Sequence, residues 1–297
     1  MKISVIGAGA LGTFYSAMLA ASGQDVTLVC RPKDVEKLRQ GISVTGIMQV
    51  NSRPKISAEP AESDLVFVTV KSYDIAAALR GLTLNPGTLV VVIHNGLGGD
   101  EMAAGVIGKC RVATGVSYSG ATFIEPGKVK ATGYSETVLG SADPGARDRL
   151  DLALIALEKA GLKARIAEDI RAAQWEKMFA NTGINAIAAL TGLNNGMLLE
   201  VPELKALVAA AVAEAEAVAA AEGINIGLNP IEHAFRVISD TKNNRSSMLQ
   251  DVSKGKRTEI DVINGKICEI GDKHGISTPV NETLTALIKG IDRRNGY

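Results

Sequence analysis

A glycine motif near the start of the chain constrains the fold more than any other feature. It follows a β-rich run (2–6), opens a helix-like stretch (10–22) and precedes a second strand-like run (25–30). Its residues fit the pattern GxGxxG and are Gly7, Ala8, Gly9, Ala10, Leu11 and Gly12. In such a strand–turn–helix the glycines allow a tight turn, the close approach of a pyrophosphate and close helix–strand packing. The motif therefore predicts a dinucleotide-binding βαβ unit; the alternative is a Gly-rich turn without a ligand.

The rest of the first half has the pattern of a parallel sheet. Residues 65–70 and 88–93 are continuous apolar runs without alternation, which is typical of strands covered on both faces. Residues 42–50 predict a small hairpin, and residues 111–138 predict further strands and loops. Strands that alternate with helices indicate βαβ units with right-handed crossovers.

Beyond about residue 166 the spacing of apolar residues becomes helical. Helices are predicted over 170–190, 203–222, 231–239, 247–254, 258–274 and 281–291. We therefore predict an α/β fold class with two domains. A Rossmann-type dinucleotide-binding domain is expected over residues 1–166, followed by a mainly α-helical domain over residues 167–297.

Composition excludes several classes of function. The 32 basic residues balance 32 acidic ones, which argues against a nucleic-acid partner and against a polybasic membrane patch. The three cysteines lie far apart without a CxxC pair, which argues against a disulfide framework or a zinc site and predicts a cytoplasmic protein. Residues 1–23 resemble a secretory signal, but the spaced glycines favour folded structure. The Ala-rich stretch at 206–221 is too short and too charged to span a membrane.

The end of the second predicted strand indicates which dinucleotide binds. An NAD site usually has an acidic residue about twenty residues after the glycines, whereas an NADP site uses a nearby arginine. Here the strand ends in Arg31 without an acid, and Lys33 adds positive charge. A guanidinium can hold a 2′-phosphate through paired hydrogen bonds. We therefore predict NADP(H) as the cofactor; the alternative is a solvated arginine after a strand.

Polar residues follow two further predicted strands. Lys71 comes directly after the run at 65–70, and Asn95 comes just after the run at 88–93. Ligands of open α/β sheets bind at the carboxyl ends of the strands, so both residues are predicted to contact the cofactor. The alternatives are an exposed strand end for Lys71 and a turn at Asn95 and Gly96.

Three polar residues share one face of a predicted helix. Lys177, Asn181 and Asn185 are spaced at i, i+4 and i+8. A solvated polar stripe is one interpretation. The other is a reaction site, because a lysine in an apolar cleft has a lowered pKa and can donate a proton near neutral pH.

These residues belong to a longer pattern that resembles the ketopantoate reductase (2-dehydropantoate 2-reductase) family. The segments that carry the resemblance are GAGALG at 7–12, Arg31, VKSYD at 70–74, HNG at 94–96, WEKMFANTGIN at 175–185, and NRSSMLQD with TEIDVING between 244 and 265. The resemblance covers nearly the whole chain and implies substrate in a cleft between the two domains. It implies the NADPH-dependent reduction of a 2-oxo acid, 2-dehydropantoate to pantoate, on the way to pantothenate and coenzyme A.

The resemblance also implies roles for individual residues. Lys177 matches a catalytic lysine that acts as general acid on the ketone oxygen, and Glu259 matches an acid that binds substrate and orients the reacting groups. Lys71 and Asn95 match residues at the cofactor, the latter near the nicotinamide. The residues matched to substrate contacts are Asn95, Asn181, Asn185, Asn195, Asn244 and Ser247.

Other interpretations of the same residues remain open. Residues 247–250 and 258–261 each fit a capping box, which would make Ser247 a helix cap and Glu259 an ordinary first-turn acid. His94 is an alternative proton donor, whereas His233 and His274 are expected to be structural. The other candidate functions are reduction of a different 2-oxo acid and a regulatory protein that binds NADP without turnover. The sequence allows a homodimer without requiring one.

Overall fold

The computed structural model describes residues 1–224 and 226–297, which fold into two compact units. The first unit comprises Met1–His94 and Gly98–Ile170, and the second comprises Asn95–Leu97 and Arg171–Tyr297. A short stretch that follows a strand of the first unit therefore packs as part of the second.

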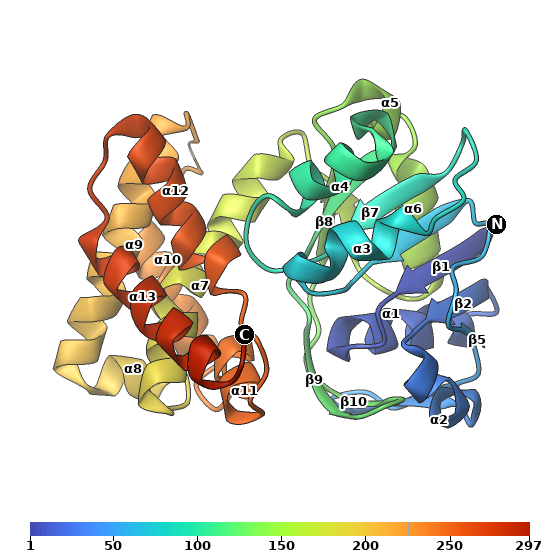
Figure 1. Cartoon of the computed structure of the whole chain (residues 1–297), viewed down its shortest axis with the longest axis horizontal. Coiled ribbons are helices and arrows are strands. Elements are labelled where there is room, and N and C mark those ends of the chain that lie inside the picture. The colour runs from blue at the N-terminus through green and yellow to red at the C-terminus, as the bar shows by residue number, and fades with distance from the viewer. Residues whose placement is uncertain (225) are drawn as a thin grey trace. The chain divides into compact units, whose positions relative to one another are not determined.

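The first unit is built on an eight-stranded sheet (Figure 1). Its strands are β1 (Lys2–Ile6), β2 (Asp25–Val29), β5 (Lys55–Ser57), β6 (Leu65–Val68), β7 (Leu89–Val92), β8 (Val112–Ser117), β11 (Thr137–Gly140) and β12 (Ala164–Ile166). The order is β5-β2-β1-β6-β7-β8-β11-β12. The strands from β5 to β8 are parallel, and β11 pairs antiparallel with β8. This is the doubly wound order, with β1 between β2 and β6 at the point where the winding reverses.

Helices cover both faces of this sheet. They are α1 (Ala10–Ala21), α2 (Val35–Arg39), α3 (Ile75–Arg80), α4 (Gly99–Ile107), α5 (Pro144–Arg147) and α6 (Leu150–Lys159), with 3₁₀ turns η1 (Pro32–Asp34), η2 (Ser72–Asp74) and η3 (Lys109–Arg111). In β6, Leu65 and Phe67 belong to the core shared with α1 and α6, while Val66 and Val68 belong to the core shared with α3 and α4. The predicted α/β fold class is thus confirmed, and burial on both faces explains the continuous apolar runs.

A second sheet of four strands also packs in this unit. It contains β3 (Ile42–Gly46), β4 (Val50–Ser52), β9 (Gly120–Glu125) and β10 (Lys128–Gly133), in the order β4-β3-β10-β9. The predicted hairpin is the antiparallel pair β3–β4, while the parallel pairing of β3 with β10 was not predicted. Helix α1 contacts strands of both sheets. That position explains why seven of its residues are buried.

The second unit is helical, as predicted. Its elements are α7 (Ile170–Thr191), α8 (Met197–Glu200), α9 (Pro202–Ala221), α10 (Pro230–Asp240), α11 (Ser247–Ser253), the 3₁₀ turn η4 (Ile260–Val262), α12 (Asn264–His274) and α13 (Pro279–Arg294). At Gly183 an added Cβ would lie 2.9 Å from Val208 Cγ1 and 3.0 Å from Val212 Cγ2, so this glycine lets α7 and α9 pack closely. Among the described residues, no helix combines the length and apolarity needed to cross a bilayer.

Two local predictions in this unit are wrong. The predicted helix over 258–274 begins only at Asn264, because η4 and the irregular backbone of Ile263 precede it. The cap of α11 is Ser246, whose hydroxyl accepts a hydrogen bond from Leu249 N–H at 3.1 Å. Ser247 is instead the first residue of the helix, so the alternative interpretation that made it the cap is wrong.

Candidate active site

The glycine turn is fixed between the carboxyl ends of β1 and β6. Gly7 has a φ of +109°, a conformation that favours glycine, and its N–H donates to Val29 O at 3.0 Å. The Thr69 hydroxyl donates to Ile6 O at 3.0 Å and to Gly7 O at 3.1 Å. At Gly12 an added Cβ would lie 1.7 Å from Gly7 O, so no larger residue fits there. The close helix–strand approach that the motif predicted is therefore present.

The start of α1 has the features of a phosphate site. Gly9 is its N-cap residue, and no side chain caps the helix. An added Cβ at Gly9 would meet no atom within 4 Å. The space beside Gly9 is therefore open, and free N–H groups at the positive end of a helix dipole are the groups that bind the pyrophosphate of a dinucleotide.

Arg31 lies at the same edge of the sheet, after β2. Its Nη2 lies 3.6 Å from Asp74 Oδ2, and its side chain is 72% exposed. Asp74 belongs to η2, the turn that Lys71 precedes after β6. Because β2 and β6 flank β1, the three residues gather around the glycine turn. Asp74 was not predicted, although it is the last residue of the VKSYD segment that carried the resemblance.

Asn95 belongs to the second unit, close to η4. The N–H of Leu97 donates to Val262 O at 3.0 Å, and Leu97 is buried in the helical core. An added Cβ at Gly96 would lie 2.1 Å from Val262 O. The loop at 95–97 is therefore attached to the turn that follows Glu259.

The histidine before this loop has a packing role. An added Cβ at Gly99 would lie 1.9 Å from His94 Nε2, so the ring lies directly against the start of α4. His274 forms an ion pair with Glu222 at 2.6 Å, and burial lowers the pKa of His233. The contact of His274 with Glu222 agrees with the structural role expected for that histidine.

Lys177 lies on α7 with an altered pKa. Desolvation lowers the pKa of its ammonium group to about 8, while the Glu259 carboxylate acts in the opposite direction and raises it. Trp175 and Met178, on either side of Lys177 in the helix, are buried in the core. Glu259 is itself only 5% exposed, so it is no ordinary surface acid of a helix start. A lysine with a pKa near 8 can both donate and accept a proton under physiological conditions.

The two amides on the same face as Lys177 carry buried donors. The Nδ2 atoms of Asn181 and Asn185 have no hydrogen-bond partner among the described residues. The hydroxyl of Ser247 lies 3.5 Å from Asn185 Oδ1, so this serine reaches the same face. A buried donor without an acceptor costs about 1–3 kcal/mol. Such donors are expected where a ligand supplies the acceptor.

Asn195 and Asn244 are joined by the backbone. The N–H of Asn195 donates to Asn244 O at 3.0 Å, and Asn195 Nδ2 donates to Thr241 Oγ1 at 2.9 Å. Asn195 is 6% exposed, so its amide holds the turn that leads into α11. Asn244 is only partly buried.

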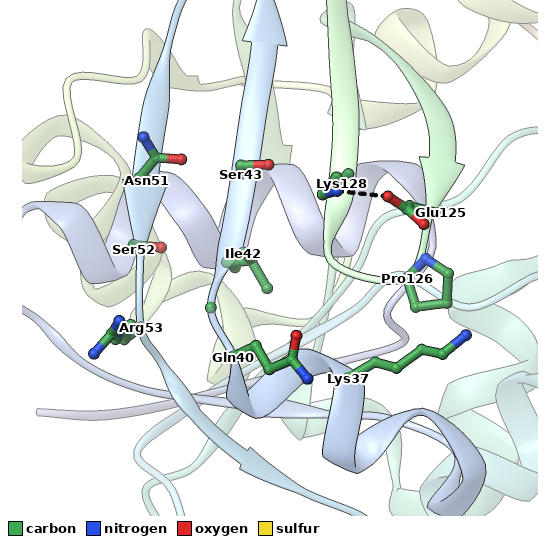
Figure 2. Close-up of a pocket in the computed structure, with 11 residues that line it drawn as sticks. Lys37, Gln40, Ile42, Ser43, Asn51, Ser52, Arg53, Glu125, Pro126 and Lys128 are labelled. Carbon is green, nitrogen blue, oxygen red and sulfur yellow. Dashed lines mark ion pairs between the residues drawn. The ribbon is translucent and has the colours of Figure 1, made fainter.

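A separate hollow of about 830 Å³ lies at the edge of the second sheet (Figure 2). Its lining residues are Lys37, Gln40, Gly41, Ile42, Ser43, Asn51, Ser52, Arg53, Glu125, Pro126 and Lys128. Lys128 Nζ pairs with Glu125 Oε1 at 2.7 Å. None of the predicted site residues lines this hollow. The candidate site residues therefore form two groups, the glycine turn with Arg31 in the first unit and the polar face of α7 with Glu259 in the second.

Comparisons with known proteins agree with these features. Residues 3–144 match the family model described as "Ketopantoate reductase PanE/ApbA", and residues 169–292 match "Ketopantoate reductase PanE/ApbA C terminal". The chain is 33% identical to a 2-dehydropantoate 2-reductase of Archaeoglobus fulgidus over 98% of both chains.

Solved structures give the same result. A PanE/ApbA family ketopantoate reductase from Ralstonia eutropha has a TM-score of 0.89 and 31% identity, with full coverage of both chains. A D-mandelate dehydrogenase, solved with NADH and anilino(oxo)acetate, has a TM-score of 0.93 and 25% identity, also with full coverage of both. The resemblance noted from the sequence is confirmed: the chain belongs to the ketopantoate reductase family of oxidoreductases.

Proposed function

We propose that this protein uses NADPH to reduce 2-dehydropantoate to pantoate, a step of pantothenate and coenzyme A biosynthesis. The observation that supports this most directly is Lys177, a desolvated lysine with a pKa of about 8 beside the buried Glu259. It shares a helix face with two buried amides whose donors are unused among the described residues. The family of the chain makes a 2-oxo acid the expected substrate. The well-separated cysteines, all three free, support a cytoplasmic location.

The proposed reaction needs a cation where negative charge develops. NADPH, when bound, supplies a hydride to the ketone carbon of the substrate. As the carbonyl double bond becomes a single bond, Lys177 stabilises the charge on the oxygen and then transfers its proton to it. The products are the alcohol, NADP+ and a neutral lysine amine, which regains a proton from solvent. Glu259 keeps the lysine protonated before the reaction.

The amides and Ser247 would hold the substrate. Asn181 and Asn185 each offer a buried N–H donor to the substrate hydroxyl, and Ser247 reaches Asn185. Ser247 lies in the first turn of α11, where the helix dipole favours an anion, and Asn244 lies just before that helix. This placement supports their assignment to the substrate carboxylate.

Replacing Arg31 by alanine is expected to weaken NADPH binding at least tenfold and to leave NADH binding nearly unchanged. A charge-assisted contact to a phosphate contributes about 1.5–3 kcal/mol, which corresponds to that factor or more. Dissociation constants of both cofactors, measured by fluorescence titration, provide the check. Arg53→Ala, at the hollow of Figure 2, is the matched control. An equal loss for both cofactors would show that Arg31 does not distinguish the 2′-phosphate.

The pH dependence should follow the titration of Lys177. Reduction needs the ammonium form, so kcat/KM for the oxo acid should fall about tenfold per pH unit above a pKa of about 8. Oxidation of pantoate needs the neutral amine and should instead rise with pH up to the same value. Because the Glu259 carboxylate raises the pKa of Lys177, Glu259→Gln should move both limbs to lower pH. Profiles that do not move would show that another group titrates.

Reduction of a different 2-oxo acid is the second candidate function. It is favoured by the likeness to the D-mandelate dehydrogenase solved with anilino(oxo)acetate. NADPH oxidation measured over a panel of 2-oxo acids separates the two. The highest kcat/KM for 2-dehydropantoate would support the first, and a higher value for an aryl-substituted oxo acid would support the second.

A further inference from the structure

Asp292 occupies an unfavourable position for an acidic residue. It lies in the last turn of α13 and is only 8% exposed. The negative end of the helix dipole favours cations there, and a buried carboxylate loses its hydration. A carboxylate at such a position needs hydrogen-bond donors that offset these costs.

Within the described part of the chain, the hydrogen bonds to the Asp292 carboxylate come from Thr258 alone. The Thr258 hydroxyl donates to Asp292 Oδ2 at 2.7 Å, and the Thr258 N–H lies 3.2 Å from Oδ1 and 3.4 Å from Oδ2. Both donors are neutral, and Thr258 is 2% exposed. Asp292 therefore holds both the backbone and the side chain of Thr258.

Thr258 directly precedes Glu259 in a segment that lacks regular secondary structure. Glu259 has backbone angles of −104° and 28°, and the 3₁₀ turn begins after it. The neighbouring charges are engaged elsewhere, since Asp261 pairs with Lys289 at 2.8 Å and with Arg257 at 3.7 Å. The hydrogen bonds between Asp292 and Thr258 therefore restrain the backbone directly before Glu259.

The opposite end of α13 is anchored separately. The Glu214 carboxylate accepts hydrogen bonds from Val280 N–H at 2.8 Å, from Asn281 N–H at 2.9 Å and from Asn281 Nδ2 at 2.7 Å. Asn264 Nδ2 donates both to Asn281 Oδ1 at 2.9 Å and to Thr182 O of α7 at 3.1 Å. The helix therefore keeps its attachment to α7 and α9 when its last turn is altered.

We propose that Asp292 is a positioning residue, which holds Glu259 against Lys177 through Thr258. The consequence for turnover rests on the function proposed above for Lys177 and Glu259. The electrostatic effect of the Glu259 carboxylate on Lys177 does not depend on that function. Asp292 touches neither substrate nor cofactor in this proposal, and its effect is transmitted through the backbone at 258–259.

The direct test measures the titration of Lys177 in the protein without substrate. The rate at which an amine-reactive acylating reagent labels Lys177 is followed against pH by mass spectrometry. Asp292→Ala removes both acceptors and is expected to lower the pKa of Lys177, because the carboxylate that favours the ammonium form is released. Asp292→Asn keeps one acceptor and should shift it less. Asp272→Ala, an exposed acid on α12, is the matched control and should leave it unchanged.

A second variant keeps the proposal testable if Asp292→Ala does not fold. Thr258→Val removes the hydroxyl but keeps the N–H, so it should produce a smaller shift in the same direction. If Asp292→Ala folds and the pKa of Lys177 is unchanged, the proposal is overturned. If Asp292→Ala does not fold, an unchanged pKa of Lys177 in Thr258→Val overturns it. Both conclusions hold regardless of the turnover rates of the variants. A lowered pKa would support it. If the pKa falls while kcat and its pH profile stay unchanged, the positioning stands and the acid role proposed for Lys177 fails.

Discussion

Lys177→Ala is expected to lower kcat for 2-oxo acid reduction by about a thousandfold, with NADPH affinity unchanged. A well-aimed donor to a developing oxyanion contributes about 10²–10³ in rate, and a general acid contributes about 10²–10⁴. The two effects reside in one group here, so they do not simply multiply. NADPH affinity should persist because the glycine turn and Arg31 belong to the other unit. Steady-state kinetics and NADPH titration measure the two quantities.

Two controls make this result specific. Lys205→Ala removes an exposed lysine of the same unit, whose Nζ lies 5.2 Å from the Phe235 ring centre, and should leave kcat unchanged. Lys177→Arg keeps the positive charge but does not release a proton, because an arginine is never deprotonated in proteins. It should therefore recover part of the lost rate. Near-normal turnover of Lys177→Ala would show that another group donates the proton, with His94 the first to examine.

Gly12→Ala is expected to destabilise the first unit by about 3 kcal/mol and to abolish NADPH binding. The added Cβ would lie 1.7 Å from Gly7 O and 2.4 Å from Thr69 Oγ1, and backbone atoms cannot move away cheaply. Insertions into packed sites cost about 1–3 kcal/mol, occasionally more, and a clash with backbone belongs at the upper end. Urea unfolding and NADPH titration measure the two effects.

Gly9→Ala separates the effect on stability from the effect on NADPH binding. An added Cβ at Gly9 meets no protein atom within 4 Å, and the residue has a φ of −77°, which alanine adopts readily. Stability should therefore remain within about 1 kcal/mol of the parent, as for other surface changes. NADPH affinity should nevertheless fall, because the methyl group occupies the space of the approaching pyrophosphate. Unchanged affinity in both variants would exclude the glycine turn as the dinucleotide site.

Much of the fold follows from local patterns. The glycine motif predicts β1, α1 and β2 because its steric demands are met only between a strand and a helix. The apolar runs predict β6 and β7 because residues on both faces are buried. The long helices of the second unit follow from the regular spacing of apolar residues on one face, as in α7 and α13.

The features that sequence patterns missed depend on contacts between distant segments. The parallel pairing of Val44 in β3 with Val129 in β10 leaves no local signal. The predicted helix over 258–274 fails because the contact of Thr258 with Asp292 stabilises an irregular segment. For the same reason, spacing alone describes Glu259 as a common first-turn acid, and only the family resemblance singled it out.

In the candidate site, too, local spacing predicted some features, while others depend on contacts between segments far apart in the sequence. The spacing on α7 placed Lys177 and the two asparagines on one face without any tertiary information. The pairing of Arg31 with Asp74, by contrast, joins loops after strands on opposite sides of β1. No pattern within either loop contains that pairing.

The assignment of these groups to two separate units has an evolutionary consequence. The glycine turn, Arg31 and Asp74 belong to the first unit, whereas Lys177, its asparagines and Glu259 belong to the second. Substitutions that share no contacting residue usually have additive effects. A lineage could therefore exchange one nicotinamide coenzyme for another by changing a few loop residues, while the acid–base groups stay intact. It could likewise acquire a new oxo acid by mutations in the helices alone, and the two adaptations could arise in either order.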